Sequence, residues 1–169
     1  MFKRLCIAAL VLCVGYAANL AQRCENGDSE ACKELIPHLQ EACDTNEANG
    51  CYNLGISYLN GQGVQQSYKE AAQYFQKACD MEEAVSCYNL GVLYVEDGAR
   101  QNYHKAKEYF QKACDAKLAP ACFNLGNSYM LGRGVRQDFA TAKEYYGKAC
   151  DLGEQEGCDN YRELRERDF

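Results

Sequence analysis

Apolar side chains along this chain recur at the three- and four-residue spacing of an amphipathic α-helix, in two separate runs within each repeated stretch. The first full stretch has Cys51, Leu54, Gly55, Tyr58 and Leu59 in one run, and Tyr68, Ala71, Ala72, Phe75, Ala78 and Cys79 in the next. Polar residues fill the other positions. Between the runs, Gly61 and Gly63 permit the left-handed backbone that ends a helix. The pattern predicts pairs of helices joined by short turns.

The helix pair repeats along the chain with its amino-acid sequence almost unchanged. Cys-Tyr-Asn-Leu-Gly stands at 51–55 and 87–91, and Cys-Phe-Asn-Leu-Gly at 122–126, so the period is 35 or 36 residues. Such a period is typical of a stacked solenoid. We predict full repeats at 50–85, 86–120 and 121–156, a truncated capping unit at 18–49, and a charged capping helix at 157–169 of the kind that solenoid ends require.

Helix boundaries can be predicted within the units. Ser67 with Glu70 has the spacing of a capping box, and Asn102 and Asp138 occupy the same N-cap position in the next two units. The turn at 96–99 is one residue shorter than its counterparts and should differ in shape. Pro37 predicts a kink in the first capping helix, or a start later than Glu34.

Ten cysteines form five pairs, each with seven residues between its members. The pairs are Cys24-Cys32, Cys43-Cys51, Cys79-Cys87, Cys114-Cys122 and Cys150-Cys158. Composition alone does not define which cysteines join. If all units are alike, however, only pairing within each couple maps onto every unit. Zinc binding by these cysteines is the main alternative to disulfides. It fits the sequence poorly, because there is no C-x-x-C motif and only His38 and His104 could add imidazole ligands.

The first residues resemble a cleaved secretory signal at 1–17. Lys3 and Arg4 form a basic start, residues 5–14 are an apolar run, and Gly15-Tyr16-Ala17 gives the small-x-small pattern at the end of the segment. Ten apolar residues are too few to span about 30 Å of hydrocarbon as a helix. A lipid anchor on Cys13 is disfavoured, because Leu12 stands where such signals need a small residue. We therefore expect a secreted or periplasmic bacterial protein, without membrane insertion, in a compartment that oxidises thiols.

The formal net charge is −6, and loss of Lys3 and Arg4 with the signal makes it more negative. An acidic surface argues against nucleic acid and against anionic lipid surfaces as partners. We expect a monomer.

The repeated Asn-Leu-Gly-x-x-Tyr run, the Gly-x-Gly-Val turn and the Ala-x-x-Tyr-Phe/Tyr-x-Lys-Ala-Cys-Asp helix resemble Sel1-like repeats, which are relatives of the tetratricopeptide repeat. The C-x7-C spacing is similar to that of the Helicobacter cysteine-rich protein (Hcp) family. The resemblance implies an all-α, right-handed superhelical solenoid of helix hairpins with one disulfide per unit. It also implies secretion, and it brings a label of β-lactamase or penicillin-binding activity.

The residues give that enzymatic label no support. A serine β-lactamase needs a lysine three residues after its nucleophile, together with Lys-Thr-Gly and Ser-Asp-Asn motifs. Neither motif is present, and no serine of the mature chain has the lysine: Ser29, Ser57, Ser67, Ser86 and Ser128. Two histidines are too few for metal-dependent hydrolysis. The sequence shows no catalytic motif and leaves any catalytic residues unknown, and we predict no cofactor and no metal site.

A row of asparagines is the best candidate for a binding site. Asn53, Asn89 and Asn124 hold one position in the first helix of each full unit, and Asn160 holds it in the cap. In the full units each asparagine lies about 100° around the helix from the next residue, a leucine that faces the neighbouring helix. Side-chain amides both donate and accept, so the row suits the peptide groups of an extended ligand. The alternative is that these amides tie adjacent units together.

Ser57 and Ser128, four residues after Asn53 and Asn124, share this predicted face. The aromatic pairs at 74–75, 109–110 and 145–146 are instead predicted to pack in the core. From the sequence we expect a secreted repeat protein that binds a protein or peptide of the host or the cell envelope through its concave surface. The alternative is β-lactamase or penicillin-binding activity on β-lactams or peptidoglycan-like peptides.

Overall fold

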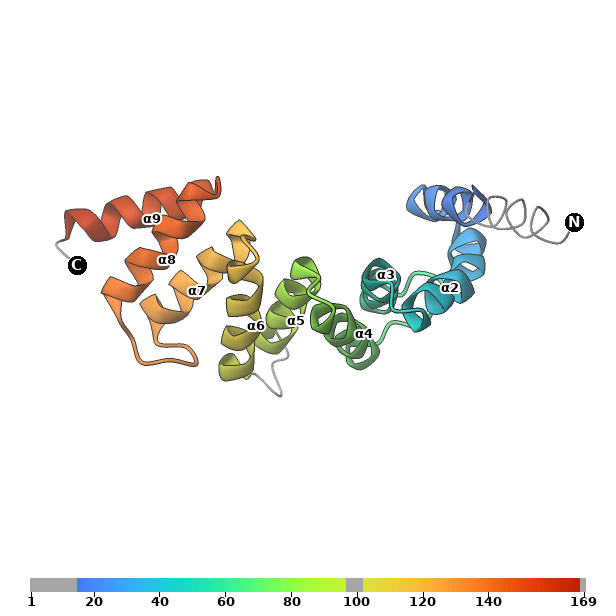
Figure 1. Ribbon diagram of the computed structural model, residues 1–169, viewed down its shortest axis with the longest axis horizontal. Coiled ribbons are helices and arrows are strands. Elements are labelled where there is room, and N and C mark those ends of the chain that lie inside the picture. Colours follow the sequence, from blue (N-terminus) through green and yellow to red (C-terminus); the bar gives the residue numbers. More distant parts are fainter. Residues whose placement is uncertain (1–14, 97–101, 168–169) are drawn as a thin grey trace, which may run out of the picture. The chain divides into compact units, whose positions relative to one another are not determined.

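The computed structural model describes residues 15–96 and 102–167 of the chain, and all regular structure within them is α-helical (Figure 1). Residues 15–25 are helical, and they are followed by α2 (Ser29–Asp44), α3 (Ala48–Asn60), α4 (Tyr68–Asp80), α5 (Ala84–Glu96), α6 (Tyr103–Asp115), α7 (Ala119–Leu131), α8 (Phe139–Asp151) and α9 (Gln155–Glu166). The all-α repeat architecture is confirmed. The chain divides after Met81 into two compact units.

Two sequence predictions fall mainly outside the described residues. Of the proposed signal at 1–17 only residues 15–17 are described, and of the turn at 96–99 only Glu96. Among the described residues no helix is both long and apolar enough to cross a membrane.

The first capping helix differs from its prediction. Helix α2 begins at Ser29, with Asp28 Oδ1 accepting from the Ala31 N–H, and it continues past Pro37 to Asp44. A start later than Glu34 is therefore wrong. A well-made N-cap and burial of Ala31 and Cys32 hold the turns before the proline in helical form.

In each full repeat the two helices approach through a glycine on the first helix. A Cβ at Gly55 would lie 2.5 Å from the ring of Phe75, and one at Gly91 would lie 2.7 Å from Phe110. Gly126 faces Tyr146 in the same way. The ring occupies the space that a side chain would need, which explains why the glycine recurs in each full repeat.

The two members of each aromatic pair have different surroundings. Phe75, Phe110 and Tyr146 are buried in the core, as predicted. The preceding tyrosines are only partly buried, and they stack on a tyrosine of the first helix, as Tyr74 does on Tyr58 with centroids 5.4 Å apart. Tyr145 stacks on Tyr129 at 5.6 Å.

Disulfides join the end of one helix to the start of the next. The structure has Cys24–Cys32, Cys43–Cys51, Cys114–Cys122 and Cys150–Cys158, and Cys79 and Cys87 are also disulfide-bonded. One disulfide per unit is confirmed.

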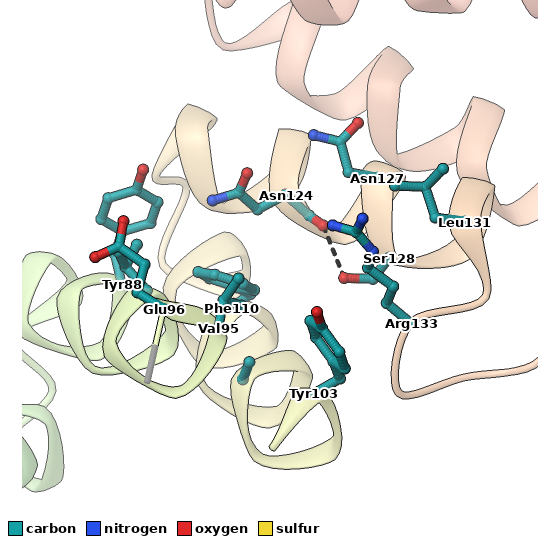
Figure 2. Close-up of a pocket in the computed structure, with 12 residues that line it drawn as sticks. Tyr88, Val95, Glu96, Tyr103, Phe110, Asn124, Asn127, Ser128, Leu131 and Arg133 are labelled. Carbon is teal, nitrogen blue, oxygen red and sulfur yellow. Dashed lines mark hydrogen bonds between the residues drawn. The ribbon is translucent and has the colours of Figure 1, made fainter. Parts of the chain in front are cut away.

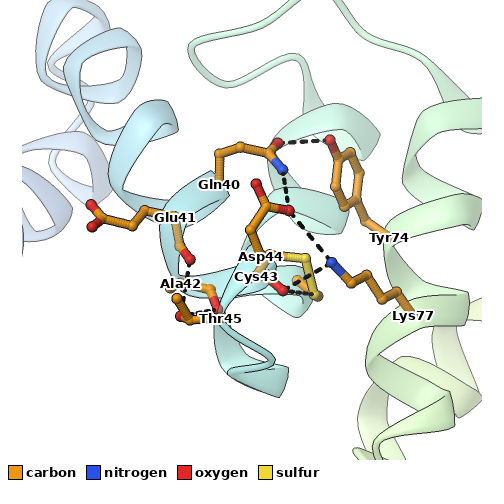
Figure 3. Close-up of a disulfide and its surroundings, with 9 residues drawn as sticks. Gln40, Glu41, Ala42, Cys43, Asp44, Thr45, Tyr74 and Lys77 are labelled. Atoms are coloured by element: carbon orange, nitrogen blue, oxygen red, sulfur yellow. Dashed lines mark hydrogen bonds and ion pairs between the residues drawn. A yellow bond between two sulfur atoms is a disulfide. The ribbon is translucent and has the colours of Figure 1, made fainter.

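Polar contacts surround the Cys43–Cys51 bridge (Figure 3). Lys77 Nζ donates to the Cys43 carbonyl at 2.9 Å and lies 3.5 Å from Asp44, and the Tyr74 hydroxyl donates to Gln40 Oε1 at 2.8 Å. Because Lys77 and Tyr74 lie on α4, these bonds attach α4 to the end of α2.

The helix caps and turns largely agree with the sequence predictions. Ser67, Asn102 and Asp138 each accept from the first turn of their helix. The reciprocal half of the capping box is not formed, because the Ser67 N–H donates to the Tyr58 carbonyl instead. Gly61 and Gly132 end their helices in the left-handed region, with φ of 72° and 68°.

Candidate functional site

A pocket of about 470 Å³ opens between α5, α6 and α7, entirely within the second unit (Figure 2). Its lining residues are Tyr88, Val92, Val95, Glu96, Tyr103, Ala106, Phe110, Asn124, Asn127, Ser128, Leu131 and Arg133. The volume lies within the range of about 300–1,000 Å³ typical of small-ligand sites.

One part of the lining is apolar. Phe110 and Ala106 on α6 are buried, and Val92 and Val95 on α5 lie beside them in the lining. Leu131, at the end of α7, is 55% exposed. These residues offer a surface for the apolar side chain of a ligand, whose burial would be favourable.

Helix α7 supplies the polar part. Asn124, Asn127 and Ser128 of this helix are among the residues that line the pocket (Figure 2). The Ser128 hydroxyl donates to the Asn124 carbonyl at 2.9 Å, which leaves its lone pairs as acceptors. Asn127 Oδ1 accepts from the Tyr146 hydroxyl at 2.7 Å, so its amino group is the part left to serve a ligand.

Of these three residues, Asn124 has the side chain with the most unused hydrogen-bonding groups. Within the described residues its amide makes no hydrogen bond, so both the amino group and the oxygen are open. A side-chain amide in this state can pair with one peptide group through a donor and an acceptor together.

The pocket also carries one acidic and one basic lining residue among those described. Glu96 lies at the end of α5, and Arg133 lies in the turn after α7. The Arg133 guanidinium carbon lies 5.7 Å from the centroid of the Tyr103 ring, in a cation–π arrangement.

The structure does not bring the predicted row together in one site. Asn124 and Ser128 line the pocket, Asn89 is outside its lining, and Asn53 is exposed on α3 of the first unit. Ser57 is only 8% exposed, so we leave it out of the candidate site.

Asn160 has a structural contact instead. Its side chain is hydrogen-bonded to the Tyr146 hydroxyl. Burial raises the pKa of Tyr146 above the usual value of 10.0, and the hydrogen bond with Asn160 partly offsets that rise. For Asn160 the interpretation that the amide ties neighbouring helices together is therefore the better one.

Sequence reasoning missed Asn127, Tyr103 and Arg133. The sequence did contain a signal for Asn127. The residue after the repeated glycine is apolar in the other two full repeats, Ile56 and Val92, and polar only here. Tyr103 and Arg133 lie at a helix start and in a turn, where no apolar period indicates which way a side chain points.

Metal chemistry gains no support from the described part of the chain. There, no group of three histidine, cysteine, aspartate or glutamate side chains is placed to hold a metal ion. The ten cysteines from Cys24 to Cys158 are held in disulfides, which leaves them without a thiolate.

The Sel1 repeat family model matches three consecutive segments, at residues 48–82, 84–118 and 119–154. These segments make up more than half of the chain. The chain belongs to the Sel1 repeat family. Comparison with curated proteins gives no match.

Solved structures of similar proteins agree with this assignment. A Sel1 repeat protein from Oxalobacter formigenes is 26% identical with a TM-score of 0.69, covering 76% of this chain and 97% of its own. The cysteine-rich protein B (HcpB) of Helicobacter pylori is 28% identical with a TM-score of 0.61, covering 78% and 95%.

A third similarity shows the fold alone. The protein c5321, a protective antigen of uropathogenic Escherichia coli with an SLR fold, is 24% identical with a TM-score of 0.72 over 90% of this chain. The chain spans only 37% of that protein. Neither the family match nor these similar structures support the β-lactamase alternative.

Proposed function

We propose that this Sel1 repeat protein is a binding scaffold, and that it recognises an extended peptide segment of a partner protein through the pocket between α5, α6 and α7. The observation that carries the proposal is the unpaired amide of Asn124 at the wall of a pocket with an aromatic and aliphatic lining. Repeat folds of this type generally serve as protein-interaction scaffolds.

The state of the amides favours binding over a purely structural role. If the asparagines locked adjacent helices together, their side chains would be hydrogen-bonded, as that of Asn160 is. Within the described residues the amides of Asn53, Asn89 and Asn124 make no such bond. A polar group that the fold does not use, beside an apolar surface that it leaves open, is the arrangement expected of a recognition site.

The roles of the pocket residues follow from their open groups. Asn124 would pair with both the N–H and the C=O of one ligand peptide group, and Asn127 would donate to a neighbouring carbonyl. An apolar ligand side chain would lie against Phe110 and Leu131. The disulfides support placing this binding outside the reducing cytoplasm, in the periplasm or beyond the cell.

A peptide-display selection on the oxidised protein tests the proposal. Enriched peptides, titrated by fluorescence anisotropy, should bind Asn124→Ala about 2- to 12-fold more weakly than the wild type, the loss expected for one neutral hydrogen bond. Thermal melts should show both proteins equally stable.

Asn53→Ala is the matched control, because this amide is also unpaired but lies in the first unit. It should leave the affinity unchanged. Failure to enrich any peptide, or equal losses for Asn53→Ala and Asn124→Ala, would contradict a site in this pocket.

A further inference from the structure

Two opposite charges lie on opposite sides of the pocket. Figure 2 shows Glu96 on the α5 side and Arg133 on the α7 side, with Asn124 between them. Both charged residues are exposed. The carboxyl of a glutamate and the guanidinium of an arginine are both ionised at neutral pH.

Among the described residues, no ion pair neutralises either charge. In the part of the chain that the structure describes, Glu96 and Arg133 take part in no ion pair, whereas other charged residues pair with close neighbours, such as Arg167 with Glu163 at 2.8 Å. Arg133 is held over the ring of Tyr103 rather than against a carboxylate. A guanidinium positioned by an aromatic ring keeps its N–H donors for a ligand carboxylate.

We propose that the pocket selects a peptide segment by its charge order, with an acidic side chain at Arg133, a basic side chain at Glu96 and an apolar residue between them. The inference rests on the proposed function, since it names the ligand class for the same site. Both ligand charges belong to side chains of the peptide. Its two termini could supply both charges only if the whole ligand fitted inside the cavity.

The first test varies only the flanks of a peptide. Five acetylated and amidated peptides share the core sequence obtained by display and carry Lys–Glu, Glu–Lys, Lys–Lys, Glu–Glu or Gln–Gln at its two ends. The blocked ends remove the terminal charges. One mixed-charge peptide should bind more tightly than the Gln–Gln peptide by about 1.4- to 5-fold for each exposed ion pair. Its advantage should shrink in 1 M salt, where the Debye length is about 3 Å.

The second test exchanges the charges of the protein. In the double variant Glu96→Lys, Arg133→Glu the preferred order should invert, so that the weaker mixed-charge peptide becomes the tighter one. Both substitutions are at exposed positions, and thermal melts check that the variant is folded.

The outcomes separate this inference from the proposed function. If the Gln–Gln peptide binds, and does so more weakly to Asn124→Ala, while both mixed-charge peptides bind equally, charge selection is wrong and peptide binding stands. If the preference exists but the exchange does not invert it, charge selection at these two residues is also wrong. If none of the five peptides binds, the proposed function fails too.

Discussion

At the scale of single residues, the third full repeat differs from the other two by a coupled polar change. Where those repeats have Ile56 with Phe75 and Val92 with Phe110 at equivalent sequence positions, the third has Asn127 with Tyr146. The buried Tyr146 hydroxyl donates to Asn127 at 2.7 Å, in addition to its hydrogen bond with Asn160. The same exchange leaves the Asn127 amino group at the pocket.

A double-mutant cycle tests this coupling. Asn127→Val and Tyr146→Phe should each cost about 0.5–1.5 kcal/mol of unfolding free energy, and the double variant should lose less than the sum, because it restores the apolar pair of the second repeat. Chemical denaturation measures all four proteins. Tyr145→Phe, which breaks a separate bond to Gln111 at 2.7 Å, is the control and should add to Asn127→Val without coupling. Additivity in the main cycle would contradict the pairing.

The residue before each first-helix cysteine gives a second residue-level prediction. A Cβ at Gly50 would lie 2.6 Å from the Cβ of Ala42, so Gly50→Ala should destabilise the protein by about 1–3 kcal/mol through overpacking. Ser86, at the equivalent position, is fully buried, and its hydroxyl has no hydrogen-bond partner among the residues that the structure describes. Ser86→Ala should therefore be neutral, or stabilise by up to about 1–3 kcal/mol. Thermal melts that ranked the two variants in the opposite order would contradict this account.

At the scale of elements, N-caps define where the second helices begin. Asp138 accepts from the Ala140 and Thr141 N–H groups and from the Thr141 hydroxyl, and these hydrogen bonds, the hydroxyl's first, hold its pKa below the usual 3.8. Asn102 caps α6 at the equivalent position without a charge.

This difference predicts a pH dependence. Because the pKa of Asp138 is lower in the folded than in the unfolded protein, the unfolded state binds more protons near that pKa, and stability from this cap is lost as the pH falls through and below 3.8. Asp138→Asn should reduce the loss of stability between about pH 5 and pH 3 while keeping the cap. Denaturation at several pH values measures it, and an identical acid profile for both proteins would contradict the role of Asp138.

Most elements could be predicted from the sequence because their apolar spacing, caps and turn glycines agree. The helix at 15–25 could not, since its first residues also fit the end of a signal sequence, although Leu20 within it is fully buried. The pocket was only partly predictable. The register placed Asn124 and Ser128 on the right face, but which repeats form a cavity depends on side-chain packing that the period does not encode.

At the scale of the whole molecule, short disulfide loops contribute much of the stability. Each closes a ring of nine residues, worth about 2.5 kcal/mol in the chain-entropy model. The five together are comparable with the about 5–15 kcal/mol net stability of a typical domain. Full reduction should therefore abolish most of the helical circular dichroism at 37 °C. An unchanged spectrum, with complete reduction verified by mass spectrometry, would show that helix packing alone holds the repeats.

The most direct test of peptide recognition at the pocket is an NMR titration of the side-chain amides with a peptide obtained by display. Binding through the pocket predicts that the Asn124 and Asn127 amino resonances shift and saturate together, because those groups gain hydrogen bonds, while that of Asn53 stays in place. Saturable shifts confined to other residues, with Asn124 and Asn127 unmoved, would contradict the account.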